Sequence, residues 1–560
     1  MKKDQEEIDF NQALFFHKNG DFNNAETLYK KVLARNPGHI NSNLILGTIY
    51  IQFKRFNEAK FFLKKTIDLD KNQYLAFQNL GIVYYKENKI DDAILNFNNA
   101  LSIKKNSFNI YADRALAYIK LEKYTDAIND LNDSLALNSN FYEAYLIRAD
   151  VFRKTKNNHN ALKDYKAYLK IHPNSFKPHY QIASILIEEE EFNEASEHLK
   201  ISLELNDKFC DSFYLMGNIN LALGKIQEAE FFYDKAIELN SNFTLAMYNK
   251  GLLNLINRNY NLGWEHYEKR KMTKEYQVPA PIKKVPDYEG QKSGNLFIWA
   301  EQGIGDQIFY LRMLHSLPKK LNLTVALDKR LISLYKRTFP KTNFIEFPKK
   351  QVLNNYDYQI LSASLGKFYA NSENKIKIFC EKKLLTNTQK DNIYIKKYKN
   401  KNKLLCGISW LSKNTISSKR KTLQLEQFKI LNEKRIDFID LQYGIEDDYI
   451  SKFNKEYGTN IFSDNDLDKL NDIDNLTSLI QACDFIISIS NVTAHLSASI
   501  GKKTFILVPF GYGLNNPWYW QDKNKSVWYE SVEIFRQSKL HEWDSVLEKL
   551  TKRIKQIYKL

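Results

Sequence analysis

Two short motifs in the C-terminal half place chemically useful side chains directly after apolar runs. The first is EQGIGD, residues 301–306, which follows the apolar run 295–300 and precedes a helical pattern. Gly303 and Gly305 allow close backbone approach, and a helix start offers free N–H groups with a partial positive charge of about half a unit. Asp306, at this helix start, could take a proton from an attacking hydroxyl. Aspartate also commonly caps a helix, and the spacing by itself favours that simpler role.

The second motif is FIISISNVTAHLSASIGKKTFILVP, residues 485–509. An apolar strand pattern ends at residue 490, and Asn491 is a good N-cap for the helix that follows. Thr493, Ala494 and His495 then fall in the first turns, so a hydroxyl, an imidazole and free N–H groups meet at one helix start. This is a suitable seat for a diphosphate. The alternative is a core histidine whose ring nitrogens are satisfied by the backbone.

Further candidates for an anionic ligand lie between these motifs. Ser409 ends an apolar run, and Lys413 and Arg420 follow it, so hydroxyl and cationic groups could hold phosphate oxygens. A basic surface loop explains the same pattern equally well. Gln442, after the run 437–441, is a weaker candidate for a base pocket. The cleft segments contain no paired carboxylates at metal-ligand spacing, so we expect no metal and no cofactor beyond the substrates.

The elements that must position these residues alternate between short apolar runs and helical patterns. This alternation predicts a doubly wound α/β fold with buried parallel strands. We expect two facing Rossmann-like halves, residues 295–400 and 401–560, with ligands at the carboxyl ends of their strands. The predicted strands are 295–299, 324–327, 343–347, 404–410, 437–442, 485–490 and 504–509, and the predicted helices are 306–317, 330–338, 424–433, 476–482 and 492–500.

Residues 5–270 have a different organisation, with a strict period of 34. Glycine or alanine recurs at this interval in two series that are 12 residues apart, which is typical of paired antiparallel helices packed closely at the small residues. About eight repeats are present. The first series is Ala13, Gly47, Gly81, Ala115, Ala149, Ala183, Gly217 and Gly251, and the second is Ala25, Ala59, Ala93, Ala127, Ala161, Ala195, Ala229 and Gly263. The pattern resembles the tetratricopeptide repeat family and predicts an α-solenoid.

The first helix of each such repeat lines a concave surface. Two positions before the first small residue, polar side chains recur in five of the eight repeats, and amides there could bind the backbone of an extended peptide. A similar asparagine ladder occurs in the O-linked N-acetylglucosamine transferases, but ordinary polar residues on a solvated face would give the same pattern. The candidate groove residues are Asn11, Asn79, Asp113, Gln181 and Asn249.

Composition and charge limit the classes of function. Residues 271–294 contain three prolines and predict a linker. Residues 1–270 hold 35 basic and 35 acidic side chains, so the whole net charge of +16 lies beyond residue 270. This excess suits an anionic partner, and a solvated lysine-rich surface would explain it equally well. The four cysteines form no CxxC pair, the N-terminus lacks a signal-peptide pattern, and we find no apolar run long enough to span a membrane. We expect a cytoplasmic protein without a nucleic-acid partner.

Taken together, the motifs resemble bacterial tetratricopeptide-repeat proteins that carry a C-terminal glycosyltransferase-like domain, related to the lipopolysaccharide heptosyltransferases. The resemblance depends on 299–314, 407–414, 441–444, 485–509 and 528–550. It implies a GT-B fold, a catalytic base at Asp306 and contact of His495 with a nucleotide-sugar. The family's Asp-Thr pair is Ser490-Asn491 here, which is a departure from the pattern.

The resulting hypothesis is a metal-independent glycosyltransferase that moves a sugar from a nucleotide-sugar to a protein or glycan acceptor recruited by the repeats. The alternative is a protein-interaction scaffold whose glycosyltransferase-like domain is inactive. Loss of the family's aspartate at Ser490 favours the scaffold, whereas Asp306 and His495 favour the enzyme.

Overall fold

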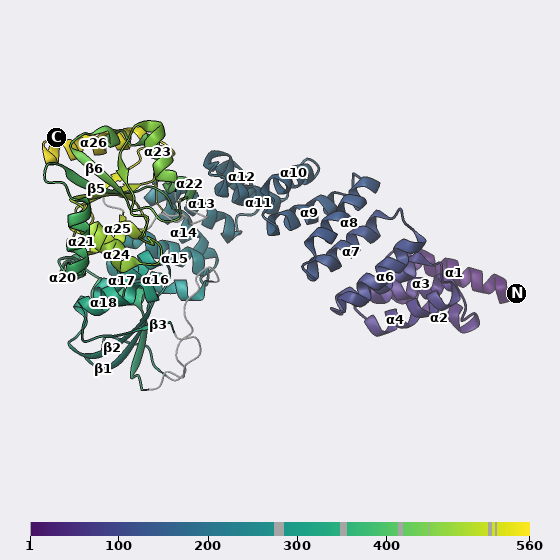
Figure 1. Ribbon diagram of the computed structural model, residues 1–560. Helices are drawn as coiled ribbons and strands as arrows, with labels where there is room; N and C mark the ends of the chain where they lie inside the picture. The colour runs from purple at the N-terminus through teal and green to yellow at the C-terminus, as the bar shows by residue number, and fades with distance from the viewer. Residues whose placement is uncertain are drawn as a thin grey trace. The chain divides into compact units, whose positions relative to one another are not determined.

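The computed structural model describes residues 2–273, 285–347, 355–412, 418–446, 448–512, 518–520 and 524–560. Contacts divide the chain into two compact units, residues 1–207 and residues 208–560 (Figure 1). Among the described residues, no helix combines the length and the apolar character needed to cross a membrane. Lys413 of the predicted site, and Pro279 and Pro281 of the predicted linker, lie outside the described residues.

The first unit is a succession of helical hairpins, as the 34-residue period predicts (Figure 1). Its helices are α1 (Lys2–Lys18), α2 (Phe22–Arg35), α3 (Ile40–Gln52), α4 (Phe56–Leu69), α5 (Tyr74–Lys86), α6 (Ile90–Ile103), α7 (Phe108–Lys120), α8 (Tyr124–Leu137), α9 (Tyr142–Lys154), α10 (Asn158–Leu169), α11 (Phe176–Glu188) and α12 (Phe192–Leu205). The alanines of both series in this unit are fully buried. At Gly81, an added Cβ would lie 2.6 Å from the ring of Phe97, which explains why a glycine stands at this helix crossing.

The turn within each hairpin places one residue in the left-handed region, again every 34 residues. The residues are Gly20, Lys54, Asn88, Glu122, Lys156, Glu190, Gly224 and Arg258, with φ between 58° and 77°. Only two of the eight are glycine, although the left-handed conformation costs other residues about 1–2 kcal/mol. Packing of the hairpin therefore imposes this turn even where the sequence contains no turn residue.

The second unit begins with the last two hairpins and a short 3-10 helix. These elements are α13 (Cys210–Ala222), α14 (Ile226–Leu239), α15 (Thr244–Ile256), α16 (Tyr260–Tyr267) and η1 (Glu268–Met272). With the twelve helices of the first unit they complete an α-solenoid of about sixteen helices.

Two parallel sheets follow, and β1 and β8 lie in the interior of one sheet each. The four-stranded sheet has the order β3-β2-β1-β4, and the six-stranded sheet has the order β10-β9-β8-β5-β6-β7. The strands are β1 (Ser293–Trp299), β2 (Lys320–Leu327), β3 (Asn343–Glu346), β4 (Tyr358–Leu361), β5 (Leu404–Ser409), β6 (Ile436–Asp440), β7 (Ile461–Phe462), β8 (Phe485–Ile489), β9 (Thr504–Val508) and β10 (Val532–Arg536). All seven predicted strands are present. The other three strands, β4, β7 and β10, were not predicted, because they are short or contain charged residues and so lack a continuous apolar run.

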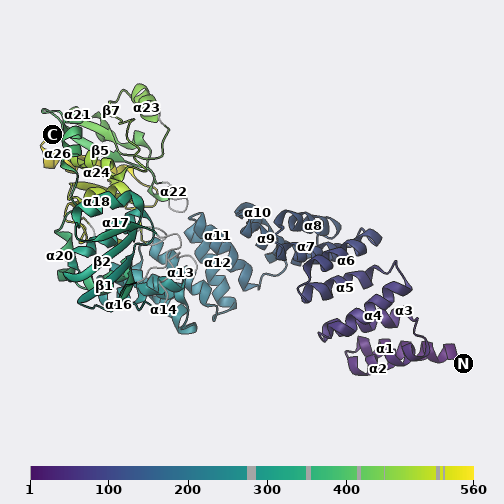
Figure 2. The same ribbon diagram turned by 60° about the horizontal axis from the view of Figure 1, so that its bottom comes forward.

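Helices connect the strands, and most of the predicted ones are present. The segment 424–433 forms two 3-10 turns, η5 (Leu425–Gln427) and η6 (Lys429–Asn432), instead of one helix. The predicted helix 306–317 is α-helical only as far as Leu311 and continues as the 3-10 helix η2 (Arg312–Ser316). The α-helices are α17 (Ile304–Leu311), α18 (Ile332–Thr338), α19 (Gly366–Tyr369), α20 (Glu373–Cys380), α21 (Thr388–Tyr398), α22 (Ser418–Lys421), α23 (Tyr449–Tyr457), α24 (Ile473–Ala482), α25 (Val492–Ser499) and α26 (Asp544–Tyr558). In both overall views α23 and α26 lie at the end of the α/β region remote from β1 and β2 (Figures 1 and 2).

The last hairpins are packed directly onto the α/β elements. The indole of Trp264 in α16 lies where a side chain on Gly366 would be, because an added Cβ would be 2.4 Å from it, and its Nε1 donates to the Ala370 carbonyl at 2.9 Å. The hydroxyls of Tyr267 and Tyr310 are 2.7 Å apart in the core. These repeats therefore share one hydrophobic core with the four-stranded sheet.

A buried ion pair joins the end of the repeat array to the loop after β1. The Arg270 guanidinium donates to both carboxylate oxygens of Glu301 at 2.8 and 3.0 Å, and both side chains are inaccessible to solvent. The Ala363 N–H also donates to Glu301 at 2.9 Å. This pair fixes the start of the 301–306 loop.

We expect Arg270→Met to destabilise the second unit by about 3–5 kcal/mol, because it leaves the Glu301 carboxylate buried without its cation. All seven tryptophans lie in residues 208–560, so tryptophan fluorescence during urea unfolding reports this unit alone. Arg258→Met is the matched control, because the Arg258–Glu373 pair is 49% and 56% exposed and should cost less than about 1 kcal/mol. Equal losses in the two variants would contradict the expectation.

Candidate functional site

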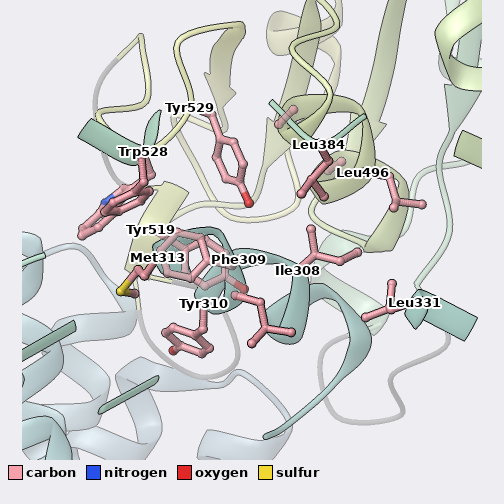
Figure 3. Packing of buried hydrophobic residues seen from close by; sticks show 14 of the residues in the cluster. Ile308, Phe309, Tyr310, Met313, Leu331, Leu384, Leu496, Tyr519, Trp528 and Tyr529 are labelled. Atoms are coloured by element: carbon pink, nitrogen blue, oxygen red, sulfur yellow. The ribbon is translucent and has the colours of Figure 1, made fainter. Parts of the chain in front are cut away.

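The two predicted motifs meet where α17 and α25 pack together, and Figure 3 shows the buried side chains around this contact. The loop after β1 leads into α17, and the loop after β8 leads into α25. A Cβ added to Gly305 would lie 2.9 Å from Cδ2 of His495, so only glycine admits the imidazole at this point. His495 therefore packs on Gly305, the residue before Asp306, and Tyr519 contacts both His495 and Asp306. The two motifs follow strands of different sheets.

Asp306 lies in the first turn of α17 and is partly exposed. Its Oδ1 accepts a hydrogen bond of 3.0 Å from the hydroxyl of Tyr519. Burial raises the pKa of this carboxyl, while Tyr519, the charge of Lys421 and the N–H of Gly303 act in the opposite direction. Asp306 therefore interacts with the N-cap residue of its helix and also offers a carboxylate with a raised pKa beside a cation.

His495 is 3% exposed and packs among aromatic rings. Its Nδ1 is 2.9 Å from the hydroxyl of Tyr529, and its ring centroid is 5.1 Å from that of Tyr519 and 5.0 Å from that of Trp520. Burial, with the charges of Arg312 and Lys421, lowers the pKa of His495 to about 3. The imidazole is neutral at physiological pH, and when Tyr529 donates to Nδ1 the ring carries its proton on Nε2.

Two cations beside these residues were not among the sequence candidates. Lys421 ends α22, is 6% exposed, and has its pKa lowered to about 8 by burial, against the pull of Asp306. Arg312 is 2% exposed, and its guanidinium carbon lies 4.1 Å from the ring centroid of Tyr529. Its guanidinium donates to the Trp528 carbonyl at 2.6 Å and makes no ion pair with a carboxylate in the described part of the chain. The region is consequently electropositive and suits an anionic ligand.

Ser409, Gln442 and Asn491 form one buried network at the ends of β5, β6 and β8. The Asn491 amide donates to Ser409 Oγ at 2.7 Å, and Ser409 donates to the Gln442 side-chain oxygen at 3.0 Å. That oxygen also accepts the N–H groups of Trp410 and Leu411. These side chains hold neighbouring loops in place, which differs from direct contact with a ligand.

The remaining predicted donor-site residues differ in burial and in whether their polar groups already have hydrogen-bond partners. Thr493 is fully buried in the first turn of α25, and its hydroxyl makes no hydrogen bond with any described residue. The N–H of Ala494 donates to Asn491 Oδ1 at 3.3 Å. Arg420 is 6% exposed beside Lys421, and Gly303 is the exposed N-cap of α17. The Thr493 hydroxyl is therefore the clearest polar group that still lacks a partner.

The candidate groove residues are partly engaged with their neighbours. Asn79 donates to the Thr48 hydroxyl at 2.8 Å, and Gln78 donates to Asp113 at 2.7 Å, so adjacent repeats are linked through these positions. In the second unit Asn249 donates to Asn218 at 2.8 Å. Asn11 is exposed and Gln181 is half-buried.

The neutral state of His495 gives a pH prediction. Its pKa is about 3 in the folded protein and about 6.5 when unfolded, so the unfolded chain takes up the proton first as the pH falls. The resulting loss in the free energy of unfolding should reach about 1.4 kcal/mol at pH 5.5 and be almost absent at pH 7.5. The free energy of unfolding is measured from urea titrations followed by tryptophan fluorescence. Between pH 7.5 and pH 5.5, the wild type should lose about 1.4 kcal/mol more of this free energy than His495→Gln loses. An unchanged difference would mean that the imidazole is solvated.

Comparison with known proteins identifies the repeats. Models of the tetratricopeptide repeat match residues 10–39, 143–175 and 210–243, and a model described as the C-terminal ARM domain of tetratricopeptide repeat protein 21 matches residues 38–156. The protein FlbA of Caulobacter vibrioides is 25% identical over 313 residues, which are 51% of this chain and 50% of FlbA. The chain thus spans about half the length of this curated relative.

Two similar solved structures each cover about a third of this chain. YrrB, described as a TPR protein with an unusual peptide-binding site, is 20% identical, with a TM-score of 0.32 over 34% of this chain and 97% of its own. MamA is 21% identical, with a TM-score of 0.28 over 30% of this chain and 92% of its own. The family models show that the chain contains tetratricopeptide repeats, and protein–protein interaction is the function that such an array indicates.

Proposed function

We propose that the protein is a glycosyltransferase of GT-B type that moves a sugar from a nucleotide-sugar to a protein or glycan acceptor. The observation behind the proposal is that His495 packs on Gly305, the residue before Asp306, and that Tyr519 contacts both side chains. Asp306 and His495 follow the carboxyl ends of strands from two separate parallel sheets. Ligands of α/β folds bind at such strand ends. The sequence resemblance to the heptosyltransferases supports the same assignment.

In this mechanism Asp306 takes the proton of the acceptor hydroxyl as that oxygen attacks the anomeric carbon. The bond from the sugar to the diphosphate breaks, and the nucleoside diphosphate leaves with the electron pair. Lys421 and the Nε2–H of His495 stabilise the negative charge on the leaving diphosphate. The start of α25, with the unpartnered hydroxyl of Thr493, supplies further donors to its oxygens.

In this proposal, some of the other donor-site candidates contact the ligand and others only position the loops. Arg420 adds positive charge beside Lys421, whereas Ser409, Gln442 and Asn491 position the loops through their mutual hydrogen bonds. Gly303 gives the ligand access to the backbone, whereas Gly305 admits the imidazole of His495. The repeats recruit the acceptor through the groove that contains Asn11, Asn79, Asp113, Gln181 and Asn249.

The second candidate function is a tetratricopeptide scaffold whose α/β region binds no donor. The observation in its favour is Asn491, which replaces the family's threonine. Its side-chain amide donates to Ser409 and its side-chain oxygen caps α25 by accepting from Ala494, so both groups are already paired. A scaffold would require neither the carboxylate of Asp306 nor the buried ammonium of Lys421.

Thermal unfolding of the full chain, followed by tryptophan fluorescence, tests the choice with UDP-, GDP-, ADP- and CMP-sugars. One of these should raise the melting temperature of the second unit in proportion to the logarithm of its concentration. Lys421→Met should weaken the effect by about tenfold in ligand concentration, because a charge-assisted contact is lost. Lys292→Met, at an exposed lysine before β1, is the control and should bind as the wild type does. If no nucleotide-sugar shifts the transition, the scaffold is the better description.

A further inference from the structure

A separate pocket of about 590 Å³ lies beside the four-stranded sheet. Trp299 at the end of β1 and Leu361 at the end of β4 are neighbours in register, and both line it. Its size is within the range of about 300–1,000 Å³ that is typical of ligand sites. None of the residues that line it belongs to the site around Asp306 and His495.

The end of the repeat array forms part of this pocket. Glu268 and Lys271 of η1 line one part of it, and η1 packs against α15, the first helix of the last repeat. Phe368 of α19 and the segment 287–289 contribute further walls. Since η1 directly follows α16, the pocket lies where the repeat array joins the α/β region.

Several polar groups of the walls are already paired. Glu268 accepts from Arg270 at 2.8 Å and from the Ser364 hydroxyl at 2.6 Å, and it pairs with Lys271 at 2.5 Å. Burial opposes its ionisation, but the charges of Arg270 and Lys271 outweigh burial and lower its pKa to about 2. Glu268 is therefore a satisfied anion that has no need of a ligand.

The same holds for the other polar side chains near the sheet. The Gln359 amide donates to the Val285 carbonyl at 2.7 Å and accepts from the Trp299 indole at 3.3 Å. The Tyr288 hydroxyl donates to the Gln291 carbonyl at 2.9 Å. A ligand rich in hydroxyls would lose water here and find few partners, whereas an apolar side chain would bury its surface at no such cost.

The charges at the entrance favour a basic neighbour for that apolar side chain. Asp287 and Glu289 are exposed, and neither makes an ion pair with a described residue. Lys271 is neutralised by Glu268, which leaves Asp287, Glu289 and Lys367 with a net charge of −1.

We propose that this pocket binds an extended peptide segment of a partner protein, with one aromatic or large aliphatic side chain inside and a lysine or arginine beside it. The apolar anchor contacts Trp299, Leu361 and Phe368, and the basic residue pairs with Asp287 and Glu289. A peptide anchored here would continue the surface of the last repeat into the α/β region.

Fluorescence anisotropy with the full chain and labelled nine-residue peptides tests the proposal. The probe has a central phenylalanine between serines with lysines at the next positions, and it is compared with versions that carry a central alanine or glutamates instead of the lysines. We expect the phenylalanine–lysine peptide to bind at least about tenfold more tightly than either variant peptide. Equal binding of the three peptides would overturn the proposal.

Two kinds of protein variant localise the binding. Leu361→Trp fills the pocket and should weaken binding by at least about tenfold, whereas Leu262→Trp places the same bulk on an exposed leucine of α16 outside the pocket and should have no effect. Because Leu361→Trp could disturb β4, Asp287→Lys with Glu289→Lys provides a surface test that should abolish the preference for lysine over glutamate. Glu381→Lys is the matched control at an exposed carboxylate elsewhere. Unchanged binding to both the filled and the charge-reversed protein would overturn the proposal.

The proposal rests on the pocket and stands apart from sugar transfer. Leu361→Trp should keep the shift of the melting temperature by a nucleotide-sugar, because its side chain lines a different site. Peptide binding without any nucleotide-sugar effect would support the pocket and contradict the glycosyltransferase. A nucleotide-sugar effect with no selective peptide binding would support the glycosyltransferase and contradict the peptide site.

Discussion

A fragment that begins after the last repeat, at residue 274, is expected not to fold, whereas residues 208–560 are expected to fold cooperatively. The shorter fragment loses Trp264, whose indole packs against Gly366, and Tyr267, which hydrogen-bonds to Tyr310 in the core. It also loses Arg270 and leaves the Glu301 carboxylate buried without its cation. Loss of a buried tryptophan and of a buried ion-pair partner would each cost about 3–5 kcal/mol, which together approach the whole stability of a typical domain.

Near-ultraviolet circular dichroism and tryptophan fluorescence during thermal unfolding distinguish the outcomes. The 208–560 fragment should show the near-ultraviolet signal and the tryptophan transition of the full chain, because all seven tryptophans lie in it. The 274–560 fragment should lack a cooperative transition and bind a hydrophobic dye. A native-like transition of the shorter fragment would show that the last repeats are an independent appendage.

The fold could be predicted where its signals are local. The 34-residue spacing of small residues reports helix crossings directly, because nothing larger than alanine fits at those positions. The attachment of the last repeats to the α/β region could not be predicted in this way. Trp264 and Tyr267 occupy ordinary repeat positions, and their partners Gly366 and Tyr310 are distant in the sequence and belong to a different kind of structure.

In the candidate site, too, the residues with a local sequence signal could be predicted and the others could not. Asp306 and His495 could be selected because each follows a strand that is recognisable from its apolar run, and parallel strands end at one edge of a sheet. Tyr519 and Tyr529 could not, because the aromatic segment around them has no strand or helix pattern that points to Asp306 or His495. Lys421 directly follows the candidate Arg420 in the sequence, but only the fold shows that its ammonium is buried beside Asp306.

The predicted donor contacts also show the limit of residue type as evidence. An asparagine at a helix start and a serine at a strand end suit a phosphate site, yet Asn491 and Ser409 hydrogen-bond to each other. Thr493, two residues further along, keeps its hydroxyl without a described partner. Only the three-dimensional arrangement separates the groups that hold the loops from those that are available to a ligand.

Asp306→Asn is expected to lower the turnover of the proposed transferase by about 10²–10⁴-fold, because general-base catalysis contributes a factor of this size. Since no acceptor is needed for hydrolysis of the donor by water, release of nucleoside diphosphate from the nucleotide-sugar that stabilises the protein provides the assay. In the wild type this activity should rise with pH as Asp306 loses its proton, with a midpoint above the usual pKa of 3.8 because burial raises the pKa of this carboxyl. The amide oxygen introduced by the substitution can still accept from the Tyr519 hydroxyl, so the donor should shift the melting temperature of the variant as it shifts that of the wild type.

The matched control is Asp544→Asn, which removes a carboxylate from the first turn of α26 instead of α17. It should retain full turnover. If Asp306→Asn loses stability, and its remaining folded fraction turns over as fast as the wild type, the carboxylate serves only the start of its helix. If turnover falls while the donor still binds, Asp306 acts as the base toward the attacking oxygen, because a neutral water or hydroxyl attacks more slowly without the carboxylate that takes its proton.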